Sequence, residues 1–411
     1  MRTPLFTMGI SALLFSLSLP AYPQALLPIG EIPEVFRIIE RYNFRVWEEG
    51  RYIGLTVREV RGILRHEQDE WYSGRFFVLG QTRRDMRPVA AAVDVSVPAR
   101  VEIGPLGAVR AGSPGRFPTM RDFPALPRGI VLPGANWQAH GERILDPDFT
   151  GAITPVPVYV DYVYTGQGDY RGFPGHFITA RYAVRYRHSE YSTGNPELVE
   201  VNGNHEMNIF LPSEAGGPRM INTRFREEYR FLSGRRLRIE GTILTIFEGA
   251  APLDRPETAA QIAEALNREE PILVTRVVQT PQLPEIELPD IEVEGRDEGV
   301  RLTINNLNFR PDSAELLPSE TPRLEVLARA LLTLPGRSFL VVGHAAATGR
   351  PEGEMQLSID RARAIADALE IRGVPAERLI FEGRGSTEPI MSNDTEAGRA
   401  RNRRVEIIIM D

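Results

Sequence analysis

Catalysis and metal binding most often depend on histidine, cysteine, lysine, serine and paired carboxylates. In this sequence, these residue types do not form a recognisable catalytic motif. The chain has no cysteine and no lysine, which excludes disulfide bonds, thiolate catalysis, Schiff-base formation and a phosphate-binding P-loop. The histidines are His66, His140, His176, His188, His205 and His344. None stands at a metal-binding helical spacing, and no Gly-x-Ser-x-Gly elbow occurs. We therefore expect a protein that is not an enzyme, with no metal site and no cofactor.

The composition is that of a globular protein with two or three domains. The chain has 411 residues, of which 42% are hydrophobic and 25% charged. The formal net charge is −7. A nucleic-acid partner would require a basic surface for its phosphates, so the charge balance indicates no such partner.

The N-terminal residues predict a secretory signal peptide over residues 1–25. Arg2 supplies the positive region, Met8 to Leu19 form an apolar run, and Ala21 and Ala25 offer small residues for cleavage. The alternative is a membrane-spanning helix, but the apolar run is shorter than the roughly 20 residues that a span needs. We expect an exported protein without a spanning helix.

Strand-like patterns dominate residues 26–279. The clearest lies over residues 178–186, where every second residue is apolar and the intervening residues are mostly arginine or threonine. A stretch broken by glycine and proline near residues 110–130 suggests a boundary between two β-rich domains, 26–115 and 116–279, the second ending in a helix over 256–268. Residues 280–298 are rich in proline and acids and predict an extended linker.

Residues 299–411 predict a compact α+β domain, with two helices on one face of a mixed four-stranded sheet. The expected strands are 301–305, 338–343, 379–382 and 405–410, and the helices begin near Thr321 and Ser358. The strings between them are Phe309-Arg-Pro-Asp-Ser-Ala-Glu-Leu316, Val342-Gly-His-Ala-Ala-Ala-Thr-Gly349, Leu357-Ser-Ile-Asp-Arg-Ala362 and Gly398-Arg-Ala-Arg-Asn-Arg-Arg-Val-Glu-Ile407. In order and spacing they resemble the OmpA C-terminal family, a periplasmic module that binds the peptide stem of peptidoglycan.

The resemblance implies a ligand site where the second strand meets the second helix. In the family, an arginine holds the carboxylate of a diaminopimelate side chain and an aspartate holds its ammonium group, which suits a zwitterion. This chain keeps the arginine as Arg361, and it keeps Thr348, Asn402 and Arg403 from the neighbouring motifs. A structural ion pair is the alternative interpretation of Arg361 and Arg403, and His344 is expected to be structural.

Three positions depart from the family's pattern. Ala346 stands where the family has its aspartate, Arg310 aligns with a second family acid, and Glu354 aligns with a family asparagine. The loss of one partner of a charged pair costs on the order of 2–5 kcal/mol, so we expect weak or altered binding of diaminopimelate. Glu354 is a candidate replacement anion, or else a solvated surface residue.

These patterns lead to three functional hypotheses. The first is a cell-envelope protein, in the periplasm or at the periplasmic face of the outer membrane, whose C-terminal domain associates with peptidoglycan. A wall built on a diamino acid other than diaminopimelate would also fit the changed site. The second is a degenerate domain with a structural role or with other envelope proteins as partners. The third is an outer-membrane β-barrel or porin, which the broken and charged strands of residues 26–250 disfavour.

Overall fold

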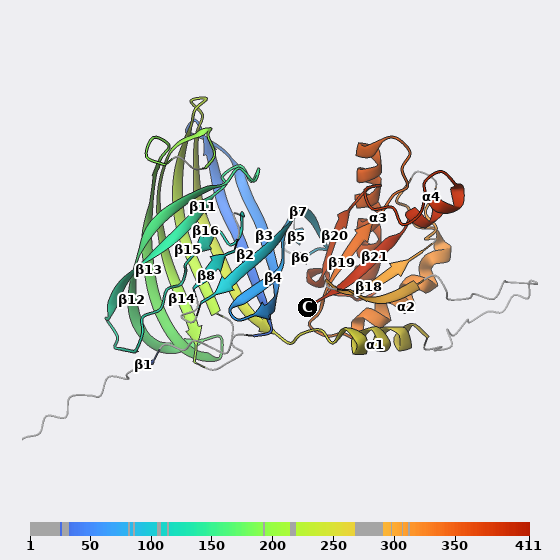
Figure 1. Cartoon of the computed structure of the whole chain (residues 1–411), viewed down its shortest axis with the longest axis horizontal. Coiled ribbons are helices and arrows are strands. Elements are labelled where there is room, and N and C mark those ends of the chain that lie inside the picture. Colours follow the sequence, from blue (N-terminus) through green and yellow to red (C-terminus); the bar gives the residue numbers. More distant parts are fainter. Residues whose placement is uncertain are drawn as a thin grey trace, which may run out of the picture.

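The structure is a computed structural model with two bodies side by side, a β-barrel and a helix-covered sheet (Figure 1). The described residues are 25–26, 33–80, 83–84, 87–104, 108–112, 115–191, 194–213, 219–267, 291–296, 298–305, 307–310 and 313–411. Nearly all of the expected signal peptide lies outside the described residues, and so do residues 280–290 of the expected linker.

One closed barrel accounts for residues 35–250. Its strands are β2 (Val35–Glu48), β3 (Arg51–Gln68), β4 (Trp71–Leu79), β7 (Ala91–Ile103), β8 (Val109–Ala111), β9 (Met120–Arg121), β11 (Asn136–Leu145), β12 (Thr154–Tyr170), β13 (Phe173–Arg187), β14 (Leu198–Pro212), β15 (Arg219–Phe231) and β16 (Arg236–Ala250). Neighbouring strands are antiparallel, an isolated bridge joins Val109 to Phe123, and the pairing of β16 with β2 closes the ring. Short pairs β1 (Ala25–Leu26) with β10 (Ile130–Val131), and β5 (Arg83–Arg84) with β6 (Arg87–Pro88), stand apart from the barrel.

The barrel corrects the expected division of the β-rich region near residue 115. Segment 115–125 leads into β9, which pairs with β11, so the proposed boundary falls inside one continuous ring. The glycine and proline breaks that suggested a boundary belong to connections within the barrel. Only the pairing of β16 with β2, some 200 residues apart in sequence, reveals the closure.

The alternation in the sequence sets the two faces of the barrel wall. The inward residues of β13, such as Ile178, Tyr182 and Tyr186, are buried in one large core cluster, as the pattern predicts. The outward residues of β14 and β15 are exposed and polar: Asn202, Asn204, Glu206, Asn208, Asn222, Arg224, Arg226, Glu228 and Arg230. The barrel is therefore filled with side chains inside. Its outer face is polar at β14 and β15, whereas β3 exposes Ile53, Leu55 and Val57.

A buried ion pair lies inside the barrel. Arg143 Nε stands 3.2 Å from Glu227 Oε1, and His205 Nε2 stands 3.0 Å from the same oxygen. Tyr229 donates a further hydrogen bond to Glu227. Burial by itself would raise the pKa of Glu227, but the charge of Arg143 and these hydrogen bonds outweigh it and hold the pKa well below its usual range.

The second body is a mixed sheet in the order β17–β18–β21–β19–β20–β7. Its own strands are β17 (Ile291–Arg296), β18 (Gly299–Ile304), β19 (Ser338–Gly343), β20 (Leu379–Gly383) and β21 (Val405–Met410). The helices are α1 (Arg255–Asn267), α2 (Thr321–Leu332), α3 (Pro351–Ile371) and α4 (Glu396–Asn402), with 3₁₀ turns η1 (Pro318–Glu320) and η2 (Ala376–Arg378). The mixed sheet and the helices α2 and α3 match the sequence expectation in outline, but α3 begins at Pro351 and not near Ser358, which lies inside the helix.

Two further strands correct the expected four-stranded sheet. Residues 291–296, predicted as part of the linker, form the edge strand β17 beside β18. At the opposite edge, Ala91 and Ala92 at the start of β7 pair in parallel with Ile380 and Phe381 of β20. A barrel strand thus continues into the second sheet, a pairing that no local pattern reveals.

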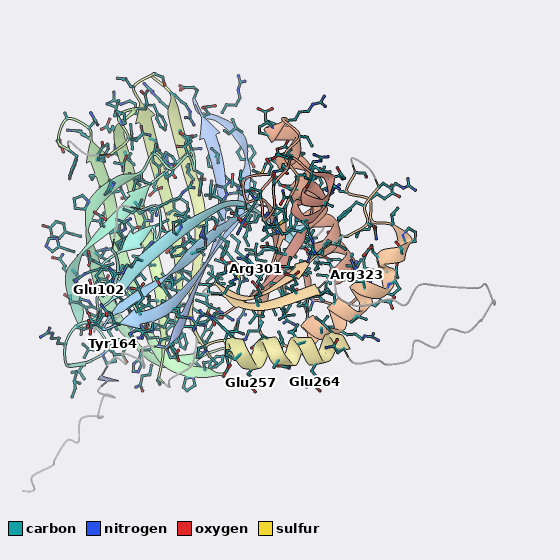
Figure 2. The ribbon with its side chains drawn as sticks, turned by 45° about the vertical axis from the view of Figure 1, so that its right-hand side comes forward. Glu102, Tyr164, Glu257, Glu264, Arg301 and Arg323 are labelled. Carbon is teal, nitrogen blue, oxygen red and sulfur yellow. The ribbon has the colours of Figure 1, made fainter. Side chains whose placement is uncertain are left out.

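Each face of this sheet covers a separate apolar cluster. On one face, α1, α2 and α3 pack over inward residues of β18, β19 and β21. Helix α1 contributes Ile262 and Leu266 to that cluster, and Leu253, just before the helix, belongs to it too, so the late helix packs with the C-terminal sheet and not with the barrel. Glu257 and Glu264 lie on the side of α1 turned away from the sheet (Figure 2).

The other face of the sheet packs against the barrel wall. Leu340, Ile380 and Ile408 of the sheet form a buried cluster with Phe77 and Leu79 of β4. Polar contacts add to it: Arg65 Nη2 stands 2.7 Å from Asp411 Oδ2, and the Leu253 amide donates to Asp411 Oδ1 at 2.6 Å. The C-terminal sheet therefore lies between a layer of helices on one face and the barrel wall on the other. No helix in the described part of the chain is long and apolar enough to cross a membrane.

Candidate functional site

A polar cleft opens at the end of the C-terminal sheet, where β19 ends and β21 begins. Its volume is about 480 Å³. It is lined by Leu307, Asn308, Phe309, Arg310, His344, Arg361, Ala400, Arg403, Arg404 and Val405. Of the predicted site residues, Arg361 and Arg403 line the cleft, whereas Thr348, Glu354 and Asn402 support the loops around it. No cluster of three or more metal-binding side chains occurs among the described residues.

Arg361 is held in place from two directions. It lies on the buried side of α3 and is 8% exposed. Its Nε donates to the Ser313 carbonyl at 3.2 Å, and its guanidinium carbon sits 4.9 Å from the centre of the Phe309 ring. A guanidinium stacked on an aromatic ring loses little further freedom when it binds a carboxylate. Arg361 therefore presents a fixed cation to the cleft.

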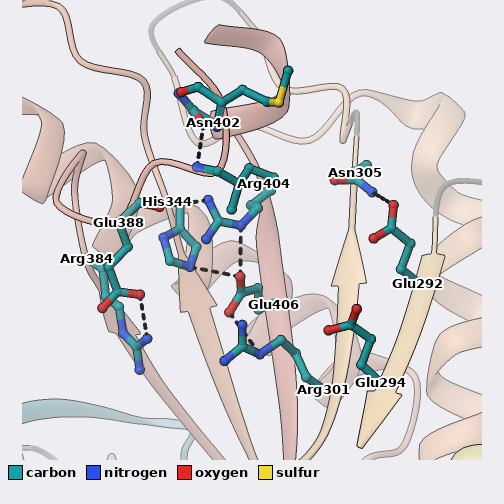
Figure 3. Close-up of polar contacts among 12 residues, drawn as sticks. Glu292, Glu294, Arg301, Asn305, His344, Arg384, Glu388, Asn402, Arg404 and Glu406 are labelled. Atoms are coloured by element: carbon teal, nitrogen blue, oxygen red, sulfur yellow. Dashed lines mark hydrogen bonds and ion pairs between the residues drawn. The ribbon is translucent and has the colours of Figure 1, made fainter. Parts of the chain in front are cut away.

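A buried charge network lies behind the cleft (Figure 3). Arg404 Nε donates to Glu406 Oε1 at 2.8 Å, and Arg301 Nε stands 3.6 Å from Glu406 Oε2. His344 Nε2 lies 3.5 Å from Glu406 Oε1. Burial would raise the pKa of Glu406, but the contact with His344 and the charges of both arginines lower it to about 2. Burial lowers the pKa of His344 below its ordinary value, which favours the neutral ring.

Glu354 organises the loop between β19 and α3. Its Oε1 accepts from the Thr348 amide at 2.5 Å, from Thr348 Oγ1 at 2.9 Å and from the Arg350 amide at 3.1 Å. Its Oε2 accepts from Ser386 Oγ at 2.5 Å, and this bond, against a small effect of burial, leads the lowering of its pKa to about 2. Three of these four bonds end on Oε1 and one on Oε2, so the carboxylate joins the start of α3 to the loop that contains Ser386. The side chain is 5% exposed, which corrects the solvated-surface interpretation.

Asn402 holds the loop that precedes α4. Its Oδ1 accepts from the amides of Ile390 and Met391 at 2.9 and 3.0 Å, and its Nδ2 donates to the Met391 carbonyl and to Asn393 Oδ1. The side chain is 1% exposed and has a full set of partners. Arg403 is more open and pairs through Nη2 with Glu396 Oε1 at 2.6 Å.

Of the positions expected to depart from the family's pattern, only Arg310 lines the cleft among the described residues. It pairs with Glu315 at 3.1 Å, with both side chains more than half exposed. Ala346 is 5% exposed beside Ala345 and is not among the lining residues.

Several lining residues were not selected from the sequence. Arg404 follows Arg403 in the late motif, but sequence gives no sign of which arginine turns inward to Glu406. Phe309 is visible only as part of the string before Arg310, and its position beneath Arg361 depends on the packing of residues 48 or more apart. For Phe309 and Arg404, the signal in the sequence was the motif that contains each residue.

Comparisons with known proteins agree with the resemblance. The OmpA family model matches residues 308–403. The chain is 33% identical over 117 residues to the outer-membrane lipoprotein YfiB of Pseudomonas aeruginosa, a match that covers 28% of this chain and 70% of that protein. Through this C-terminal domain, the chain belongs to the OmpA family.

Two further relatives match parts of this chain. The chain is 40% identical over 105 residues to the probable lipoprotein YiaD of Escherichia coli, covering 26% of this chain and 48% of the relative. It is 31% identical over 178 residues to the peptidoglycan-binding protein ArfA of Mycobacterium bovis, covering 42% and 53%. The chain therefore spans about half the length of these two relatives.

Proposed function

We propose that this chain is a non-enzymatic cell-envelope protein whose C-terminal domain associates with peptidoglycan through the cleft beside Arg361. One observation carries the proposal: the family's arginine lies in a cleft of about 480 Å³, stacked on Phe309 and fixed by Ser313. One relative is named a peptidoglycan-binding protein, and others are named lipoproteins. We place the chain in the periplasm or at the periplasmic face of the outer membrane.

We assign a role to each predicted site residue from its hydrogen bonds. Arg361, assisted by Arg403, holds a carboxylate of the stem peptide. Thr348, Glu354 and Asn402 position the two loops that border the cleft, because their polar atoms already bond to those loops. Glu354 is thereby assigned to the loop and not to the ammonium of a ligand.

The residues on the two faces of the barrel wall argue against the pore hypothesis. A barrel in a lipid bilayer needs an apolar outward band, and a porin needs a water-filled interior. Here the outward residues of β14 and β15 are charged or amide-bearing, and the inward residues fill the interior with aromatic and aliphatic groups. We therefore do not propose a pore.

The structural alternative is supported by one observation. The sheet face opposite the helices is covered by the barrel wall, so this domain does make an extensive protein contact. The contact lies on a different face from the cleft and leaves the cleft's lining residues uncovered. It is compatible with a binding role as well as with a purely structural one.

Sedimentation of the full chain with purified cell-wall sacculi tests the proposal. We expect the wild-type protein to pellet with sacculi, and Arg361→Ala to reduce binding by roughly 30-fold or more, since the loss of a charged partner costs on the order of 2–5 kcal/mol. Arg363→Ala is the matched control, because Arg363 lies on the same helix, stacks on Phe381 and does not line the cleft. Equal binding by all three proteins would replace the proposal with the structural alternative.

A further inference from the structure

We infer that this cleft selects a carboxylate with no ammonium group beside it, which is an anionic rather than a zwitterionic end of a stem peptide. The inference rests on the proposed function and concerns the chemical class of the ligand. It depends on the charges that line the cleft and on the placement of Arg310.

The lining of the cleft is cationic. Four of its ten residues are arginines, and no aspartate or glutamate is among the described lining residues. The carboxylates that pair with Arg310, Arg403 and Arg404 are Glu315, Glu396 and Glu406, which are outside the lining. A ligand that enters the cleft therefore meets guanidinium groups first.

Arg310 places a positive charge at the cleft, where it repels an ammonium group. It reaches the cleft from the segment after β18, on the side that Phe309 and Arg361 also border. Its ion pair with Glu315 joins two side chains that are more than half exposed, and exposed pairs of this kind neutralise each other weakly. Like charges brought together in an interface weaken binding, so Arg310 disfavours a ligand that carries an ammonium group.

The inference is tested with two synthetic stem peptides that differ only in one side-chain amine, which is free in the first and acetylated in the second. Isothermal titration of the full chain measures both affinities. We expect the wild-type protein to prefer the acetylated peptide by about fivefold or more, since removal of the amine's charge removes its repulsion by Arg310. Arg310→Asp should reverse the preference, and Arg363→Asp, with the same change in charge, should leave it unchanged.

The outcomes separate this inference from the proposed function. Preference of the wild-type protein for the free amine, or the absence of binding to either peptide, overturns the inference even if sacculi are still bound. Loss of sacculus binding by Arg361→Ala together with the expected peptide preference supports both. Because Arg310 is exposed, Arg310→Asp should keep the fold, and its circular dichroism spectrum checks this.

Discussion

Two adjacent residues of β21 should report separately on the two layers that cover the C-terminal sheet. Ile408 faces the barrel and is 2% exposed in the cluster with Phe77 and Ile380. Ile407 faces the helices and is fully buried in the other cluster. The substitutions Ile408→Ala and Ile407→Ala remove the same atoms from opposite sides of one strand.

The expected magnitudes depend on whether the barrel is present. In the full chain each substitution should lower the free energy of unfolding by about 2–5 kcal/mol, the usual range for a buried aliphatic residue cut to alanine. In a fragment of residues 251–411, Ile407 keeps its helix-side surroundings and its full cost. Ile408 loses the barrel wall, becomes a surface residue, and should change stability by less than about 0.5 kcal/mol.

Urea denaturation provides the assay, because the two bodies have different spectroscopic signals. All three tryptophans, Trp47, Trp71 and Trp137, lie in the barrel, so tryptophan fluorescence follows its unfolding. The described α-helices lie in residues 255–402, so ellipticity at the helical minimum follows the C-terminal body. The fragment 251–411 includes α1 and β17, and it should be more stable than 299–411, which we also expect to fold alone.

A cost for Ile408→Ala that is the same in the fragment as in the full chain would refute this reasoning. It would mean that elements of the C-terminal body, and not the barrel, cover that face of the sheet. A fragment without a cooperative transition would show instead that the barrel supplies part of the core the domain needs to fold. Ile407→Ala, with a similar cost in both proteins, controls for strain in β21 itself.

Three other predictions concern export, the barrel interior and pH. Mass spectrometry of the mature protein should find cleavage near Ala21–Ala25, and an intact Met1 would contradict the signal peptide. Glu227→Gln should destabilise the barrel by about 3–5 kcal/mol in thermal or chemical melts, because it leaves Arg143 buried without its anion, and a cost below 1 kcal/mol would contradict this. Because the pKa of Glu406 is lowered to about 2 on folding, its stabilisation is present above its unfolded pKa of about 4.3 and is lost as pH falls from there toward 2. Melting temperatures over that window should therefore fall less steeply for Glu406→Gln, and equal slopes would contradict the assignment.

The sequence by itself determined the features that local spacing encodes. The short motifs that contain Gly349, Arg361 and Asn402 predicted loops, a helix at Arg361 and the family. This was possible because the residues of each motif are close in sequence and belong to a single element or loop. Alternation over residues 178–186 gave the two faces of β13 correctly, since neighbouring residues of a strand point to opposite sides.

Only the tertiary structure decided what each face packs against. The closure of β16 on β2 and the pairing of β7 with β20 join residues about 200 and 290 positions apart, and a strand's pattern shows that a face is buried without showing which partner buries it. Helix α1 looked like the end of the β-rich region, yet its apolar residues fit the C-terminal cluster. The role of Glu354 was open in sequence because it depends on Ser386, which folding brings within 2.5 Å from 32 residues away.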